Sequence, residues 1–501
     1  MQSLSRREFL GLGLAGAAGM MVRHPLMSLL GQAEAAAGEY NVLFLPVDDL
    51  RPTIGCYGAP MIQTPSLDRM GAEGTVFTRA YCQQAVCSPS RTSLLTGCRP
   101  DTTRVYDLQT HFRDTIPDVV TLPEQFKAHA YHSQGMGKVY HGGLDDEQSW
   151  SVPHSRPRCK SWATEESIEL MKRLREEVIA AGNDPKEKKY RVRGYPWEAP
   201  EVPDNVLHDG AVADMAIETL NEVKDRPFFL ACGFIKPHLP FIAPRKYWDL
   251  YDHDAIELAD NPFAPEDAPQ YALTKWGELR SYYGMPKQGP VTDEQARQLI
   301  HGYYAATSFM DAQIGRLMDE LERLGLREKT IIVMWGDHGW QLGDHGLWCK
   351  HTNFETSVHS PLIISVPGQQ PATCDALVEF VDIYPSLCEL CGVPLPEGLE
   401  GTSFAPLIED PTRPWKAAAF SQYPRYIPEV GRGMGHSMRT DRYRFTEWRV
   451  PDKDFCEYEL YDHEVDPKEN VNIAKRPENA ELVTQLAEQL HAGWQGALPT
   501  S

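Results

Sequence analysis

Three apolar runs along the chain each stop abruptly at charged or imidazole side chains. The runs and the groups that follow them are Asn41–Val47 with Asp48 and Asp49, Pro227–Phe234 with Lys236 and His238, and Thr330–Gly336 with Asp337 and His338. A continuous apolar run of this length is typical of a strand buried on both faces. The carboxyl ends of strands in an open α/β sheet carry its site, so we expect these polar groups to lie at one edge of such a sheet.

Helical periodicity separates these runs. Residues 292–324 place Tyr303, Met310 and Leu317 at helical spacing, and this pattern ends at Gly325. Shorter helices are predicted at 64–70, 121–127, 164–180, 209–223 and 381–391, and further strands at 75–81 and 360–367, the second as the last strand of the main sheet. This alternation predicts an α/β sheet sandwiched by helices.

The pattern changes near residue 416. Short alternating stretches occur at 421–423, 435–440, 443–448 and 457–462, and a helical pattern follows at 477–494. Alternation of this kind predicts a small antiparallel sheet, here packed by one helix. We therefore expect a main domain over residues 40–415 and a smaller α+β subdomain over residues 416–501.

Residues 1–37 have the pattern of an export signal. Arg6 and Arg7 form a twin-arginine box, residues 9–22 form a weakly hydrophobic core rich in Gly and Ala, and residues 32–37 offer small-residue cleavage sites. The alternative is a membrane anchor, but the apolar run is short and interrupted by glycines. The pattern predicts recognition by the twin-arginine export machinery, cleavage, and a periplasmic or secreted bacterial protein without a stable membrane anchor.

The charge balance limits the partners of the protein. The 501 residues carry a formal net charge of −21, which argues against nucleic acid as a partner. It also gives no general attraction for a polyanion, so an anionic substrate must be bound by a local positive pocket.

The eleven cysteines do not indicate a zinc site. Cys388-x-x-Cys391 has redox or zinc spacing, but it lies in a predicted amphipathic helix that ends at Gly392, and no second Cys/His pair accompanies it. We predict that both thiols pack in the core.

Cys87 begins a segment with an anion-binding pattern. Cys87-x-Pro89-x-Arg91 runs into residues 92–95, which can enter a helix, so a small nucleophile stands at a helix N-terminus beside a guanidinium. Unpaired backbone N–H groups and the positive end of the helix dipole favour an anion there. The alternative is a buried structural thiol beside a turn proline.

This segment, with Thr96-Gly97 after it, resembles the signature of the type I, formylglycine-dependent sulfatase family. The resemblance implies that a formylglycine-converting enzyme oxidises Cys87 to Cα-formylglycine, whose hydrate is the nucleophile. It also implies an alkaline-phosphatase-like mixed sheet in a catalytic domain over residues 40–415, with the antiparallel subdomain that sulfatases carry at the C-terminus.

The neighbouring carboxylates predict a metal site. Asp48 and Asp49 repel each other unless a cation lies between them, although a turn with an Asx cap is the simpler alternative. The sulfatase resemblance implies one divalent cation, Ca²⁺. Its ligands would be Asp48, Asp49, modified Cys87, Asp337 and His338. Many sulfatases carry Asn at the place of His338, whereas the iduronate branch carries His.

The resemblance also assigns the remaining catalytic residues. Arg91, Lys138 and Lys350 would bind the sulfate oxygens, His141 would act on the aldehyde hydrate, and His238 would protonate the leaving group. Taken alone, the Gly137-Lys138 pair is more typical of a flexible turn with a solvated lysine, and a histidine between prolines can merely cap a turn.

The resemblance covers nearly all of residues 40–470 and, within sulfatases, is greatest to the iduronate 2-sulfatase branch. Segments at 48–52, 83–87, 99–104, 236–238 and 421–425 carry it, although 99–104 by itself predicts only a surface turn. It implies sulfate ester hydrolysis on a sulfated oligosaccharide, with the 2-O-sulfate of a uronic acid as the expected group. Residues 145–205 and 255–290 depart from that branch and are expected to line the sugar pocket.

Two other functions stay open from the sequence. A phosphodiesterase or phosphonate monoester hydrolase of the same superfamily shares the metal site and the nucleophile. A periplasmic glycan-binding protein whose Cys87 stays unmodified would need no catalysis.

Overall fold

The structure is a computed structural model that describes residues 38, 40–59, 61–159 and 162–499. The predicted export signal, residues 1–37, lies outside the described residues. Among those described, no helix combines the length and the apolar character that a membrane crossing requires.

A mixed central sheet forms the main layer of the described chain. Its strands are β1 (Asn41–Val47), β2 (Thr75–Phe77), β4 (His132–Gly137), β6 (Phe228–Gly233), β8 (Thr330–Gly336), β11 (Leu362–Ser365) and β12 (Ala372–Cys374). Their order is β12-β2-β11-β8-β1-β6-β4, and β11 runs antiparallel to its neighbours β8 and β2. The neighbours β8, β1, β6 and β4 are parallel, so their carboxyl ends meet at one edge.

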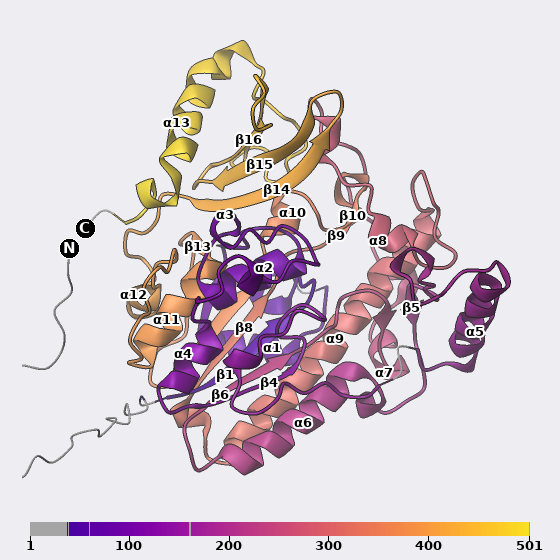
Figure 1. The fold of residues 1–501 in the computed structure, drawn as a ribbon, viewed down its shortest axis with the longest axis vertical. Helices are drawn as coiled ribbons and strands as arrows, with labels where there is room; N and C mark the ends of the chain where they lie inside the picture. Colours follow the sequence, from indigo (N-terminus) through magenta and orange to yellow (C-terminus); the bar gives the residue numbers. More distant parts are fainter. Residues whose placement is uncertain (1–37, 39, 60, 160–161, 500–501) are drawn as a thin grey trace, which may run out of the picture. The chain divides into compact units, whose positions relative to one another are not determined.

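Helices cover both faces of this sheet (Figure 1). One face packs against α2 (Cys87–Thr96), α4 (Leu122–Ala128) and α11 (Ile383–Leu390), and the other against α1 (Pro65–Ala72), α6 (His208–Val223) and α9 (Asp293–Arg323). Strand β1 shows why its sequence is apolar throughout: Val42 and Phe44 enter the first core, while Leu43 and Leu45 enter the second. The predicted fold class is confirmed.

A second, antiparallel sheet forms the C-terminal part. Its strands β14 (Ala419–Ile427), β15 (Gly431–Arg439), β16 (Tyr443–Arg449) and β17 (Cys456–Asp462) pair in chain order. Helix α13 (Ala480–Gly496) packs on it through Leu486 and Leu490. The predicted subdomain is therefore present, while the boundary at residue 416 stays a prediction, because all the described residues belong to one compact unit.

The remaining elements are short or lie in the long connections. They are β3 (Ala80–Tyr81), α3 (Pro100–Thr103), α5 (Glu165–Ala180), β5 (Trp197–Glu198), β7 (Phe241–Ile242), α7 (Arg245–Trp248), α8 (Gly277–Arg280), β9 (Gln341–Leu342), β10 (Trp348–Cys349), α10 (Glu355–Val358), β13 (Val378–Glu379) and α12 (Ala405–Glu409). The segment between α7 and α9 is mostly irregular, and α8 is its α-helix.

Three local predictions were wrong. Residues 75–81 form two short strands, β2 and β3, whose residues are all buried, rather than one alternating strand. The main sheet does not end at 360–367, because β12 adds a further strand beyond β2. The segment 99–104 is not a surface turn: Arg99 is buried and donates two hydrogen bonds to Glu379, at 2.7 and 2.8 Å, a partner 280 residues away.

The prediction for Cys388 and Cys391 was right. All eleven cysteines are free thiols, and these two lie in the core on the α11 face of the sheet.

Candidate active site

The parallel strands bring the predicted polar groups to one edge of the sheet. Asp48 follows β1, Lys138 follows β4, Lys236 and His238 lie in the turn after β6, and Asp337 follows β8. Helix α2 begins at the same edge with Cys87. Since adjacent parallel strands end side by side, segments that are almost 300 residues apart in sequence converge here.

Cys87 is the first residue of α2 and is buried. The residue before it, Val86, has no side chain that can cap the helix, so backbone N–H groups at this end are open to a ligand. Cys87 Sγ lies 3.4 Å from His338 Nε2. Burial raises the pKa of the thiol well above its usual range, and the charge of Asp48 adds to this effect. An unmodified thiol here stays protonated and is therefore a poor nucleophile.

Three buried aspartates face one another beside Cys87. The backbone N–H of Asp49 donates to Asp337 Oδ1 at 3.0 Å. Asp49 has φ of 60°, a left-handed conformation that Asp tolerates better than most residues and that turns its side chain back toward the edge. Burial raises the pKa of Asp49, whereas the charge of Lys138 and other nearby cations overcomes burial and lowers the pKa of Asp48.

The donor atoms of this edge fit a hard divalent cation. Asp48, Cys87, Asp337 and His338 place one ligand atom each within 4.8 Å of one another, and Asp48, Asp49, Cys87 and His238 do the same. Two of the four residues in each group are aspartates, and the two groups together contain three, whose oxygens suit Ca²⁺ better than a soft metal. The five predicted ligands are thus brought together, and His238 lies beside them.

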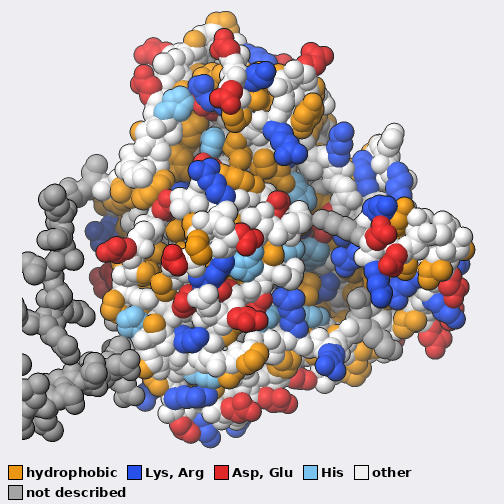
Figure 2. Space-filling view, viewed as in Figure 1, with side chains coloured by type: hydrophobic (Ala, Val, Ile, Leu, Met, Phe, Trp, Pro, Cys, Tyr) orange, Lys and Arg blue, Asp and Glu red, His pale blue; other side chains and the backbone are white. Residues whose placement is uncertain are grey.

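Three cations surround the aspartates. Arg91 Nε donates to Asp337 Oδ2 at 2.8 Å, and Lys138 Nζ donates to Asp48. Lys350 Nζ lies 2.9 and 3.0 Å from the two carboxylate oxygens of Asp49. Three cations are thus concentrated at this edge, each paired with an aspartate, whereas basic and acidic side chains are interspersed on the face shown in Figure 2.

The two predicted catalytic histidines both lie at this edge, but their imidazole rings have different partners. His141 has its pKa lowered to about 4, first by burial and then by the charge of Lys138, and its Nδ1 has no hydrogen-bond partner in the described part of the chain. His238 Nε2 lies 3.0 Å from Glu278 Oε1 and 3.8 Å from Asp49 Oδ2. One imidazole is therefore neutral and unpaired, and the other is held by carboxylates.

Sequence reasoning missed Glu278 and the role of Lys236. Glu278 lies on α8, in a long acidic segment with no periodic pattern, so no local signal could have identified it. The sequence motif gives Lys236 no role of its own. In the structure its Nζ donates to the carbonyls of His238 and Pro240 at 2.9 and 2.6 Å. Burial lowers the pKa of Lys236 to about 8.

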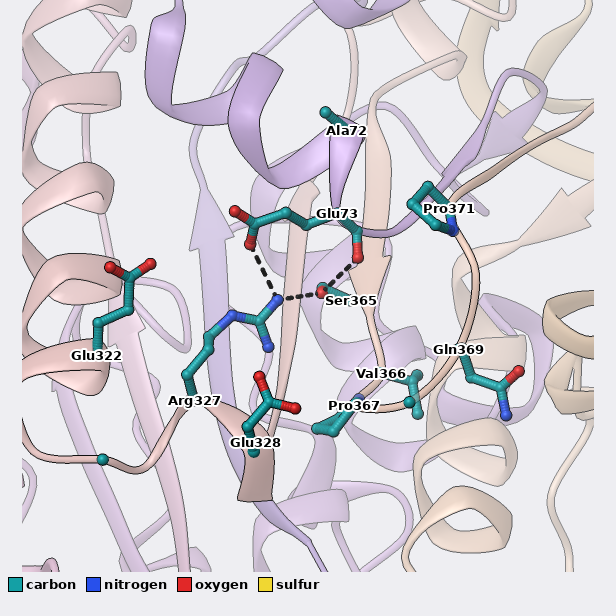
Figure 3. A pocket seen from close by; sticks show the side chains of 12 residues that line it. Ala72, Glu73, Glu322, Arg327, Glu328, Ser365, Val366, Pro367, Gln369 and Pro371 are labelled. Carbon is teal, nitrogen blue, oxygen red and sulfur yellow. Dashed lines mark hydrogen bonds and ion pairs between the residues drawn. The ribbon is translucent and has the colours of Figure 1, made fainter.

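The opposite edge of the sheet holds a cavity of about 600 Å³ that lacks these features (Figure 3). It lies before the start of β8 and after the end of β11. Its basic group, Arg327, already pairs with Glu73 at 3.1 Å and donates to Ser365. Glu322 and Glu328 also line it, so this cavity is unsuited to an anion.

Comparison with known proteins agrees with the site at the carboxyl edge. Residues 40–393 match the family profile described as Sulfatase, and residues 343–495 match one described as N-sulphoglucosamine sulphohydrolase, C-terminal. The chain belongs to the sulfatase family. As a sulfatase it is a sulfuric ester hydrolase, and the predicted recognition is confirmed.

Two sequence relatives cover almost the whole sulfatase chain. Iduronate 2-sulfatase of Homo sapiens is 33% identical, over 91% of this chain and 94% of its own length. A sulfatase of Formosa agariphila is 29% identical, over 92% of this chain and 89% of its own length.

Solved structures share the fold. A protein in complex with its substrate D-glucosamine-2-N,6-O-disulfate has a TM-score of 0.71 at 22% identity, over 92% of this chain and 98% of its own. A phosphonate monoester hydrolase of Agrobacterium radiobacter has a TM-score of 0.71 at 22% identity, over 90% of this chain and 95% of its own. At these identities the likeness concerns the fold and leaves the substrate to be decided by the site.

Proposed function

We propose that this sulfatase removes the 2-O-sulfate of a uronic acid in a sulfated glycan. The observation that carries the proposal is the convergence of Cys87 at a helix N-terminus, three buried aspartates and three cations at one sheet edge. The identity of 33% with human iduronate 2-sulfatase over most of both chains supports the uronate. One of the proteins that share the fold was solved in complex with a sulfated glucosamine, and this supports a glycan as the substrate class.

A modified residue 87 and a metal ion would complete the site, and the residues present fit both. Cα-formylglycine, made from Cys87 by a converting enzyme, would supply a hydrated aldehyde as the nucleophile. Ca²⁺, held by Asp48, Asp49, residue 87, Asp337 and His338, would supply positive charge that polarises a bound oxygen. The burial of the Cys87 thiol supports the modification, because burial raises its pKa and so disfavours the thiolate that would be the nucleophile without it.

The protein's own side chains divide the remaining work. Arg91, Lys138 and Lys350 bind the sulfate oxygens and offset the charge that develops on them. His238 donates a proton to the sugar oxygen as the S–O bond breaks and its electron pair passes to that oxygen. His141 is neutral at neutral pH and has Nδ1 open, so it accepts the proton that the nucleophile must lose for sulfate to leave.

We also propose that residues 1–37 direct twin-arginine export and are then removed, so that the enzyme acts in the periplasm or outside the cell. The twin-arginine pattern of Arg6 and Arg7 supports this. Replacing both arginines by lysine should leave the protein in the cytoplasm, as measured by cell fractionation. Unchanged export would contradict the proposal.

Sulfate release from a panel of defined 2-O-sulfated uronate disaccharides tests the function. The enzyme, made in a host with a converting enzyme, should release sulfate from these and not cleave matched phosphate or phosphonate esters. Since Cys87 provides the nucleophile, Cys87→Ala should lower kcat by a factor on the order of 10⁴ or more. Cys456→Ala, at an exposed thiol far along the chain, is the matched control and should be fully active.

Mass spectrometry of the peptide that contains residue 87 completes the test. An aldehyde mass is expected at this position. An unmodified thiol together with sugar binding but no turnover would favour the glycan-binding alternative. Faster cleavage of phosphate or phosphonate esters than of any sulfate ester would favour the other hydrolase.

A further inference from the structure

We propose that Glu278 is a positioning residue that fixes His238 and Lys350 for departure of the sugar oxygen. This inference rests on the proposed function, in which His238 protonates that oxygen. Glu278 belongs to the segment between α7 and α9, which the sequence marks only as an acidic loop.

Glu278 forms a bridge between two groups of the site. Its Oε1 lies 3.0 Å from His238 Nε2, and its Oε2 lies 3.0 Å from Lys350 Nζ. The side chain is 15% exposed, so this is a largely desolvated contact and not a screened surface pair. Burial opposes ionisation of Glu278, but the charges of Lys350 and His238 hold its pKa well below the usual range. The bridge is therefore an ionised carboxylate with one oxygen on each partner.

The His238 ring has one short contact at each nitrogen, and Glu278 supplies the one at Nε2. Lys236 Nζ donates to the carbonyls of His238 and Pro240, which fixes the backbone of the turn. The ring nitrogen Nδ1 faces the carbonyl of Leu239. At the catalytic end of the ring, Glu278 at 3.0 Å is nearer to Nε2 than Asp49 at 3.8 Å. Glu278 thus holds the nitrogen that carries the proton at the edge of the sheet, and the sugar oxygen must replace Glu278 as the acceptor for the transfer to occur.

Lys350 depends on Glu278 in a similar way. Its neighbours Cys349 and His351 have φ of 74° and 79°, so the backbone presents this side chain from a left-handed turn. Lys350 Nζ lies 4.7 Å from the centre of the Trp340 ring and reaches Asp49 and Glu278. With Glu278 in place, the ammonium group is held between the aspartates and His238, where leaving-group charge develops.

Glu278 itself transfers no atom in this scheme. The proton moves from His238 Nε2 to the sugar oxygen, and that oxygen takes the electron pair of the broken S–O bond. Positioning of this kind is needed for a poor leaving group such as a sugar alkoxide. It is nearly irrelevant for an aryl sulfate, whose phenolate leaves without a proton.

The test compares leaving groups in Glu278→Gln. With a 2-O-sulfated uronate disaccharide as substrate, kcat should fall by about 10²-fold, because His238 is no longer positioned to protonate the sugar oxygen. For 4-nitrophenyl sulfate, kcat should fall by only about 3-fold, because its leaving group needs no proton from His238 and only the hold of Glu278 on Lys350 is lost. KM for either substrate should rise by about 3-fold at most, because Lys350 is one of three cations that bind the sulfate. Glu278→Asp, which keeps the charge on a shorter stem, should recover part of the loss. Glu266→Gln, an exposed residue of the same segment, is the matched control.

Each outcome decides for or against the role. Equal losses on both substrates in Glu278→Gln and Glu278→Asp would show a general structural role and overturn the proposal, as would no loss on either. If wild-type enzyme cleaves no uronate sulfate, the proposed substrate fails. The same comparison is then made between an alkyl and an aryl sulfate that the enzyme does cleave. Should Glu278→Gln not fold, Glu278→Asp provides the comparison.

Discussion

Two buried charge clusters in this sulfatase have similar composition and different construction. One is the active-site cluster of Asp48, Asp49, Asp337, Arg91, Lys138 and Lys350. The other, here called the Arg444 cluster, consists of Arg439, Arg444, Glu355, His463 and Glu469 and joins α10 to the C-terminal sheet. Both contain carboxylates whose oxygens could in principle approach a metal ion.

In the Arg444 cluster the cation lies between the acids. Arg444 Nε donates to Glu469 Oε1 at 2.6 Å, and Arg444 Nη2 donates to Glu355 Oε2. The other oxygens are also bound, since Tyr81 donates to Glu355 Oε1 and the N–H of Glu355 donates to Glu469 Oε2, both at 2.8 Å. Every carboxylate oxygen here has a protein donor, and an arginine separates the two acids, so the contacts join α10 to the C-terminal sheet.

In the active-site cluster the acids lie between the cations. Three aspartates point toward one another at strand ends, and Arg91, Lys138 and Lys350 contact them from the outside. Each aspartate oxygen also has a protein donor here, but the three acids lie side by side with the basic groups outside them, and like charges forced together favour a cation. The comparison shows that the arrangement of buried charge, and not its amount, distinguishes a site from a structural link.

Of the changes within the two clusters, Asp49→Asn should have the largest effect. Asn tolerates the φ of 60° at this position, so the fold should be kept while one carboxylate charge of the cation site is lost. We expect kcat/KM for a sulfate ester to fall by about 10³-fold, the loss of one strong electrostatic contact to the transition state. Added Ca²⁺ should raise the Tm of chelator-treated wild type but not of the variant, because a ligand stabilises only the state that binds it.

Asp319→Asn is the control for this change, because the Asp319 side chain is 66% exposed and pairs with Arg69 at 2.8 Å, on the surface of the protein. It should leave both activity and the Ca²⁺ response unchanged. If Asp49→Asn kept the Ca²⁺ response, Asp49 would not belong to the cation site.

Arg444→Met should separate stability from activity. It leaves Glu355 and Glu469 without their central cation, and breaking a buried pair in this way lowers the free energy of unfolding by about 3–5 kcal/mol. At a temperature where the variant is folded, kcat should stay within about 2-fold of wild type, since Arg444 touches no group of the site. Urea unfolding and turnover measure the two effects. Arg432→Met, at an exposed arginine of β15, should unfold as wild type does.

A smaller effect is expected at Glu459, beside the Arg444 cluster. Glu459 accepts hydrogen bonds from Trp448 Nε1 and Tyr461 OH, both at 2.7 Å, and burial raises its pKa to about 7. The folded protein therefore keeps a proton that the unfolded chain has lost above its usual pKa near 4.5. The free energy of unfolding should fall as pH rises from about 4.5 to about 7, by at most about 1.4 kcal/mol per pH unit.

Glu459→Gln removes this titration. Urea unfolding at pH 5 and pH 7 should therefore show a smaller difference in the variant than in wild type. An equal difference in both proteins would mean that Glu459 does not titrate in this range.

Local patterns predicted those parts of the molecule that depend on local physics. The strand ends at Asp48 and Asp337 and the long helix α9 could be predicted because burial on both faces and helical periodicity are written in consecutive residues. Arg99 and Arg444 could not be recognised as buried, because the acids that neutralise them, Glu379 and Glu355, lie 280 and 89 residues away.

The amino-acid sequence by itself determined the sulfatase signature at Cys87, the strands that end in aspartate and the order of two sheets along the chain. Only the tertiary structure decided which charges meet. It brought Glu278 from an irregular segment to His238 and Lys350, at 3.0 Å from each, and it left Arg444 between two acids as a structural link. The physical reason is that short contacts between charges depend on distance in space, whereas periodicity and motifs report only on neighbours along the chain.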